Sequence, residues 1–169
     1  MELILPSRKY YDSYAAAISE YKDQGIDTYA FMDIGKYDVF EKFENYRIGK
    51  DLPDNYVAAT YLWLVGRDEF IGEISIRHSL TDSLMRFGGN IGYGIRYSKW
   101  NNGFGTMMLA MALGYAKETL GLEKVLITCN DDNIGSARVI EKNGGSLQDK
   151  IVNVIDGVER LTRRYWITI

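Results

Sequence analysis

Cysteine is almost absent from this sequence, and the shortage restricts how the fold can be stabilised. Cys129 is the one cysteine among 169 residues, so no internal disulfide can form. A structural zinc site is not expected either, because such sites combine several Cys and His side chains and the chain has one histidine. We therefore expect no metal. Low cysteine content fits a reducing compartment, so we expect a cytoplasmic protein.

Long apolar runs and an excess of positive charge are also missing. No stretch approaches the roughly 18 apolar residues that span a bilayer, and Met1 leads into a short apolar strand instead of a signal-like segment. The net charge of −3 gives no general basic patch. Neither a membrane nor a nucleic acid is therefore an expected partner. The length and ordinary composition predict one globular domain over residues 1–169.

Hydrophobic periodicity predicts a chain of alternating strands and helices. The predicted helices are 9–21, 37–48, 104–120 and 133–142. The predicted strands are 2–5, 56–65, 70–80, 88–96 and 124–129, followed by a hairpin of 146–155 and 158–169 around Asp156-Gly157. The strand, helix and strand between 88 and 129 imply a right-handed parallel crossover within an otherwise antiparallel sheet. The fold class is therefore mixed α/β.

A glycine-containing loop between residues 96 and 106 carries the first functional signal. An alternating strand ends before a polar loop, and Gly103-Phe-Gly105 then opens a strongly apolar helix. The first N–H groups of a helix lack partners and lie at its positive end, and glycine lets an anion approach the backbone. Asn101 or Asn102 can cap this helix. The pattern predicts an anionic ligand that carries a pyrophosphate.

Two motifs and the strand between them give the chain its resemblance to a known family. The loop Trp100-Asn-Asn-Gly103-Phe-Gly105 is similar to the acetyl-CoA loop Arg/Gln-x-x-Gly-x-Gly/Ala of the GNAT N-acetyltransferases. The segment from Asn133 to Gly144 is similar to the family's Asn-x-x-Ser/Ala…Glu-Lys-x-Gly helix. The resemblance covers essentially the whole chain.

The resemblance implies a fold, a donor and a set of donor-binding residues. The fold would be a mostly antiparallel sheet of six to seven strands with one parallel, splayed crossover. The donor would be acetyl-CoA, and the acceptor a primary amine of a small molecule or peptide, by direct transfer in a ternary complex. Pantetheine would lie along the exposed strand edge. The implied cofactor contacts are Tyr93, Gly94, Ile95, Asn101, Asn102, Gly103, Phe104, Gly105, Thr106, Asn133, Ser136 and Lys142.

Three positions depart from the family pattern. Ile140 stands where many members carry a tyrosine that protonates the leaving thiolate. Gly88-Gly89-Asn90 stands where a catalytic glutamate is often found. Trp100 replaces the basic or amide residue that begins the loop. A standard acid and base are therefore not evident, and Trp100 offers the phosphates no charged side chain.

The sequence offers a small set of candidate acids and bases. His78 has two interpretations: a half-buried structural residue on the predicted strand, or a general base. Glu73, on the opposite face of that strand, is the second candidate base, and Tyr93 and Tyr165 are candidate acids. Cys129 is interpreted as a small buried residue and not as a nucleophile.

Two other functions remain open at this stage. A CoA-binding sensor without turnover is compatible with the missing tyrosine and glutamate. An acyltransferase that uses a different acyl-CoA is also compatible with the pattern. The C-terminal hairpin can pair with a second copy of the chain, so a homodimer is possible.

Overall fold

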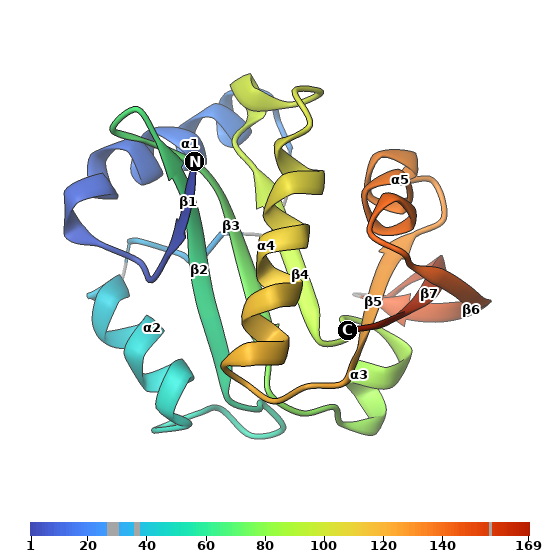
Figure 1. Cartoon of the computed structure of the whole chain (residues 1–169). Coiled ribbons are helices and arrows are strands. Elements are labelled where there is room, and N and C mark those ends of the chain that lie inside the picture. Colours follow the sequence, from blue (N-terminus) through green and yellow to red (C-terminus); the bar gives the residue numbers. More distant parts are fainter. Residues whose placement is uncertain (27–30, 36–37, 156) are drawn as a thin grey trace.

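The computed structural model describes residues 1–26, 31–35, 38–155 and 157–169. A single seven-stranded sheet runs through it in the order β1-β2-β3-β4-β5-β7-β6 (Figure 1). The strands are β1 (Glu2–Ile4), β2 (Ala59–Gly66), β3 (Glu69–Arg77), β4 (Ile91–Ile95), β5 (Lys124–Asn130), β6 (Ser146–Ile155) and β7 (Val158–Thr168). Only β4 and β5 pair in parallel among the described strands. The predicted mixed α/β class with one parallel crossover is confirmed.

Five α-helices flank this sheet in the described part of the chain: α1 (Tyr11–Asp23), α2 (Val39–Ile48), α3 (Asp82–Arg86), α4 (Phe104–Glu118) and α5 (Ile134–Lys142). Helix α2 begins two residues later than predicted, because the side chain of Asp38 caps it by accepting from the Phe40 N–H at 3.0 Å. The predicted connection at 81–86 folds instead into α3, which Thr81 caps. Tyr37 of the predicted helix and Asp156 of the predicted turn lie outside the described residues.

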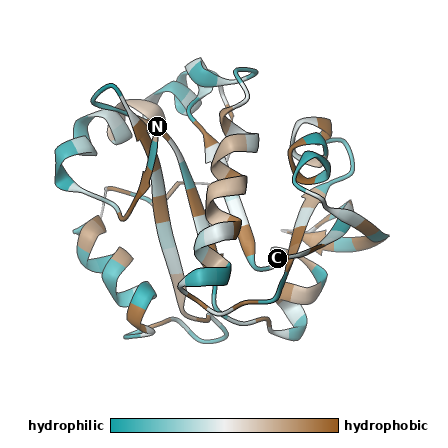
Figure 2. Cartoon of the chain, viewed as in Figure 1, coloured by the Kyte–Doolittle hydropathy of each residue, from teal (hydrophilic) through white to brown (hydrophobic). Residues whose placement is uncertain are grey.

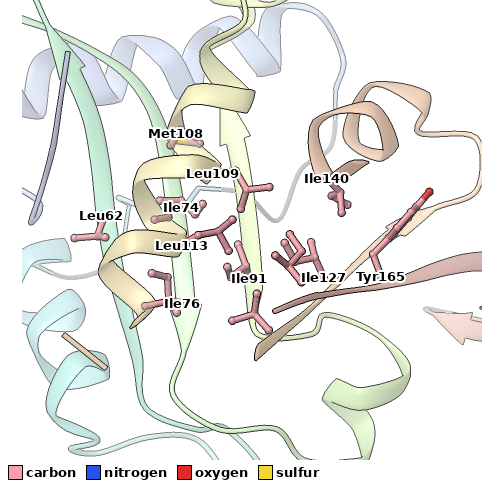
Figure 3. Close-up of a cluster of buried hydrophobic side chains, with 14 of the residues drawn as sticks. Leu62, Ile74, Ile76, Ile91, Met108, Leu109, Leu113, Ile127, Ile140 and Tyr165 are labelled. Atoms are coloured by element: carbon pink, nitrogen blue, oxygen red, sulfur yellow. The ribbon is translucent and has the colours of Figure 1, made fainter. Parts of the chain in front are cut away.

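The sheet carries a separate apolar core on each face. Helix α4 lies across one face, where Met108, Leu109 and Leu113 pack with Ile74, Ile76 and Ile91 (Figure 3). Figure 2 shows apolar residues along most of α4, in agreement with its burial. Helices α1 and α2 cover the opposite face through an aromatic cluster around Trp63. The Tyr14 and Trp63 rings of this cluster stack with their centroids 4.5 Å apart.

Strands β4 and β5 meet at one point and then diverge. Their register has a single described pair, Ile91 with Ile127, and Figure 1 shows the two strands running apart beyond it. Buried Asn90 holds the closed end, because its Oδ1 accepts from the Leu126 N–H at 2.8 Å and its Nδ2 donates to the Arg77 carbonyl at 3.2 Å. Gly89 allows this close approach, since a Cβ at that position would lie 2.3 Å from the Leu126 carbonyl oxygen. The fold thus opens β4 towards its carboxyl end.

Candidate functional site

The divergence leaves one backbone edge of β4 available. The Arg96 N–H donates to the Ile71 carbonyl of β3 at 2.8 Å. Backbone groups of an antiparallel strand alternate in direction, so the N–H and C=O groups of Tyr93 and Ile95 point away from β3, into the opening. The Ile95 carbonyl accepts there from the Tyr21 hydroxyl at 2.6 Å and from the Trp100 indole N–H at 2.7 Å. This edge is suited to pair with an extended amide-containing ligand.

The amino end of α4 has no side-chain cap in the part of the chain that the structure describes. Gly103 is the N-cap residue, with a φ of 78° in the left-handed region. The prediction that Asn101 or Asn102 caps this helix is wrong. The Asn102 side chain donates back to the Trp100 and Lys99 carbonyls, at 2.8 Å and 3.3 Å, and so stabilises the preceding turn. The first N–H groups of α4 therefore remain available to an anion.

The open edge of β4, the start of α4 and the start of α5 enclose a cavity of about 670 Å³. Of the residues predicted to contact a cofactor, all except Asn102 line it: Tyr93, Gly94, Ile95, Asn101, Gly103, Phe104, Gly105, Thr106, Asn133, Ser136 and Lys142. Arg138 and Lys142 add positive charge to the wall and Asp132 adds negative charge, whereas Lys99 is paired with Glu69 at 2.6 Å. A negatively charged ligand with a long polar arm fits this lining.

Helix α5 and β4 are tied together across the opening. The Asn133 side chain caps α5 by accepting from the Ser136 N–H at 2.9 Å. Ser136 Oγ in turn lies 2.9 Å from the Tyr93 hydroxyl. Burial raises the pKa of the Tyr93 phenol, which is therefore protonated at neutral pH. Tyr93 thus presents a neutral hydroxyl at the cavity wall.

The other candidate acids and bases do not line this cavity. The His78 Nε2 lies 2.9 Å from the Thr60 Oγ1, and burial together with the nearby Arg47 charge lowers the pKa of its ring. Glu73 is fully buried on the α1 face, where its Oε2 accepts from the Trp63 indole N–H at 2.7 Å. Tyr165 is buried and donates to Glu141 at 2.9 Å. Their catalytic roles stay predictions.

Cys129 is 7% exposed, as expected for a small buried residue. Burial raises the pKa of its thiol, so the thiolate is disfavoured at neutral pH. A role as nucleophile gains no support from this environment.

Sequence reasoning missed several residues of the cavity wall. Tyr21 comes from α1, and the sequence marks it only as an apolar helical position. Trp100 is visible in the sequence as a departure from the loop pattern, but its bond to the Ile95 carbonyl is a tertiary contact. Arg138 lies within the Asn133 motif on the exposed face of α5, and its contribution to the wall appears only in the fold.

Comparison with known proteins agrees with this geometry. A family model described as acetyltransferase (GNAT) domain matches residues 11–146. No curated protein sequence matches the chain. Within the residues that are described, no helix is long and apolar enough to cross a bilayer.

Several solved acetyltransferases share the fold at low sequence identity. Microcin C7 self immunity acetyltransferase MccE, solved with acetyl-CoA and AMP, is 18% identical, with a TM-score of 0.71 over 99% of this chain and 91% of that chain. A variant of spermidine N-acetyltransferase SpeG from Vibrio cholerae is 18% identical, with a TM-score of 0.65 over 99% and 95%. Ribosomal-protein-S5-alanine acetyltransferase from Vibrio fischeri is 13% identical, with a TM-score of 0.70 over 98% and 91%. The chain therefore belongs to the GNAT acetyltransferase family and is an acyltransferase.

Proposed function

We propose that this protein transfers the acetyl group of acetyl-CoA to a primary amine of a small molecule or peptide, within a ternary complex. The observation that carries the proposal is the opening between β4 and β5, with an uncapped α4 amino terminus at its end. The neighbouring structure of MccE contains acetyl-CoA, which supports the choice of donor. In the proposed complex, the pyrophosphate accepts from the first N–H groups of α4 and pantetheine pairs with the edge of Tyr93 to Ile95.

The reaction that we propose needs no covalent enzyme intermediate. The acceptor nitrogen attacks the thioester carbonyl carbon, and the Tyr93 N–H, at the far end of the pantetheine arm, donates to the oxygen that gains negative charge. The C–S bond then breaks, CoA leaves as the thiolate or thiol, and the nitrogen loses a proton to water or to a base. An alkylamine has a pKa near 10.4, so its deprotonation at pH 7 costs on the order of 4–5 kcal/mol. Tyr93 is the proposed donor of a proton to the thiolate.

Release of free thiol from acetyl-CoA in the presence of a panel of primary amines tests this function. The assay should show thiol release that depends on both enzyme and amine, and mass spectrometry should show an amine product heavier by one acetyl group. Binding of acetyl-CoA without release by any amine would favour a CoA sensor. Release from longer acyl-CoA thioesters in preference to acetyl-CoA would indicate a different acyl donor.

The Trp100 indole occupies a backbone acceptor that the proposed pantetheine arm needs. Trp100 Nε1 and the Tyr21 hydroxyl both donate to the Ile95 carbonyl, so a pantetheine amide that docks there has to displace one of them. We propose that it displaces the indole, because Trp100 is exposed and Tyr21 is buried. Trp100→Phe removes the competing N–H. We expect this variant to bind acetyl-CoA roughly 2- to 10-fold more tightly, the equivalent of one neutral hydrogen bond.

Calorimetric titration with acetyl-CoA measures the affinity, and tryptophan fluorescence reports the movement of the indole. The wild type should show a fluorescence change on acetyl-CoA addition that Trp100→Phe lacks. Trp166→Phe is the matched control, because Trp166 lies on β7 and bonds to Gln148, and it should retain the change. A weaker affinity of Trp100→Phe would mean that the indole contributes to the bound state instead of competing with it.

A further inference from the structure

Arg77 is the last residue of β3 and lies at the closed end of β4, where its N–H donates to the Asn90 carbonyl at 2.7 Å, and its side chain is on the face opposite to α4. Ile74 and Ile76 of β3 point towards α4 (Figure 3), so Ser75 and Arg77 project to the other face. Gly92 pairs with Ser75 in the register of β3 and β4. A Cβ built on Gly92 would lie 3.8 Å from Arg77 Nη1. Because Gly92 has no side chain, the guanidinium lies next to the β4 backbone at Gly92, between Ile91 and Tyr93.

Among the described residues, no carboxylate forms an ion pair with Arg77. The other strongly shielded arginines do have one: Arg96 pairs with Glu20 at 2.7 Å, Arg163 with Asp131 at 2.6 Å and Arg164 with Asp149 at 2.5 Å. Arg77 Nη1 donates only to the Gly88 and Gly89 carbonyls, each at 3.2 Å. A guanidinium that is half-buried without an opposite charge is energetically costly, and this cost calls for an explanation.

One edge of this guanidinium makes no hydrogen bond in the described part of the chain. Nε and Nη2 of Arg77 have no hydrogen-bond partner within the described ranges. Every completely buried side-chain nitrogen and oxygen in these ranges does have a partner. These two nitrogens are therefore not completely buried. The Nε and Nη2 edge of an arginine is a planar fork that matches the two oxygens of a carboxylate.

The surroundings of Arg77 also favour an anion. Burial lowers the pKa of the Arg77 guanidinium. The titratable groups that act on its charge are the hydroxyls of Tyr61, Tyr56 and Tyr46. The Tyr46 and Tyr61 rings lie with their centroids 5.7 Å apart. The surroundings of the guanidinium are thus polar and aromatic, without a described carboxylate that acts on its charge.

We propose that the acceptor amine carries a carboxylate close to its nitrogen, as in a free α-amino acid, and that Arg77 binds this carboxylate through Nε and Nη2. The inference rests on the proposed acetyl transfer, because it places the acceptor on the α1 and α2 face of the opening. A carboxylate at Arg77 would set the neighbouring amine beside Gly92 and Tyr93, where the thioester is expected. A polyamine, which has no carboxylate, would leave the arginine uncompensated.

Matched acceptor pairs that differ only in the carboxylate test this inference. Phenylalanine with phenethylamine and lysine with cadaverine are suitable pairs, assayed by thiol release from acetyl-CoA and by calorimetry in the presence of CoA. For the wild type, we expect kcat/KM to be roughly 10- to 100-fold higher for the amino acid of at least one pair, the equivalent of a charge-assisted bidentate contact. Arg77→Gln should remove this preference, because kcat/KM should fall much more for the amino acid than for the decarboxylated amine.

Controls separate binding from folding and from the proposed reaction. Arg77→Lys keeps the charge without the fork and should recover only part of the preference, and Arg160→Gln, on the exposed part of β7, should leave it intact. Thermal unfolding identifies a variant that fails to fold. Thiol release only with the decarboxylated amines, or equal loss for both members of a pair in Arg77→Gln, would overturn the inference. Absence of thiol release with every amine would contradict the proposed function. In that case, calorimetry would still test Arg77, because the wild type should bind the amino acid of a pair more tightly than the decarboxylated amine and Arg77→Gln should not.

Discussion

Replacing Gly103 with valine should weaken acetyl-CoA binding by about 100-fold or more, because the position combines a left-handed backbone with the space that the ligand needs. Gly103 has a φ of 78°, and a Cβ built there would meet no protein atom within 4 Å. The protein itself therefore leaves this space open at the start of α4. A valine side chain would occupy it and would also disfavour the conformation that aims the first N–H groups of the helix at the pyrophosphate.

Gly121 provides a matched control for this prediction. It has a φ of 66°, follows the other end of α4, and likewise has no atom within 4 Å of a built Cβ. Gly121→Val should therefore carry a similar backbone cost in unfolding experiments without any loss of acetyl-CoA affinity. Calorimetry on both variants separates strain from ligand contact. Unchanged affinity in Gly103→Val would refute the assignment of this loop to the pyrophosphate.

The second large effect concerns Glu73, for which we expect Glu73→Gln to stabilise the protein at neutral pH. Burial raises the pKa of the Glu73 carboxyl from 4.5 to about 8. Below pH 4.5 the carboxyl is protonated in both the folded and the unfolded state and makes no difference. Between pH 4.5 and 8 only the unfolded state ionises, so stability falls as pH rises, and above 8 the loss is constant. At pH 7 the loss amounts to about 3 kcal/mol.

Glutamine removes this loss because it is neutral and still accepts a hydrogen bond from the Trp63 indole N–H. We expect Glu73→Gln to gain roughly 2 kcal/mol at pH 7 and little at pH 4, less than the full amount because the amide brings an additional donor. Chemical denaturation between pH 4 and 8.5 measures both. Glu118→Gln, at the exposed end of α4, is the control and should leave the pH dependence of stability unchanged. A lower stability of Glu73→Gln at pH 7 would show that the folded protein holds Glu73 ionised.

The same variant helps to assign the general base. If Glu73 only packs beneath α1, Glu73→Gln should keep the kcat/KM of the wild type, whereas loss of activity in a stable variant would identify it as a base. The comparison variant is His78→Ala. Burial lowers the pKa of the His78 ring from its ordinary value of 6.5. If His78 is the base, kcat/KM should therefore decrease in acid, with a midpoint at a pH lower than 6.5. An acid limb that is identical in His78→Ala and wild type would remove His78 as the base.

Local patterns in the sequence were sufficient for the order of the strands and of the four longer helices, and for most of the cavity wall. The glycine pattern at Gly103 and Gly105 and the Asn133 cap depend on residues close together in the chain, so their spacing already encodes the turns that they make. The cap at α4 shows the limit of such reasoning. Asn101 and Asn102 have the right chemistry, but the turn before Gly103 directs the Asn102 side chain to carbonyls behind it.

The sequence by itself determined the strand, loop and helix that present a row of free backbone donors, because hydrogen-bond direction and glycine conformation are local properties. Only the tertiary structure decided where charge is left uncompensated and where the strands separate. Asn90 closes β4 on β5 through contacts with Leu126 and Arg77, and Glu73 and Arg77 lie on one face of β3 without a described ion-pair partner. These features depend on residues distant in sequence, since burial and pairing are set by packing of whole elements and not by the spacing of neighbours.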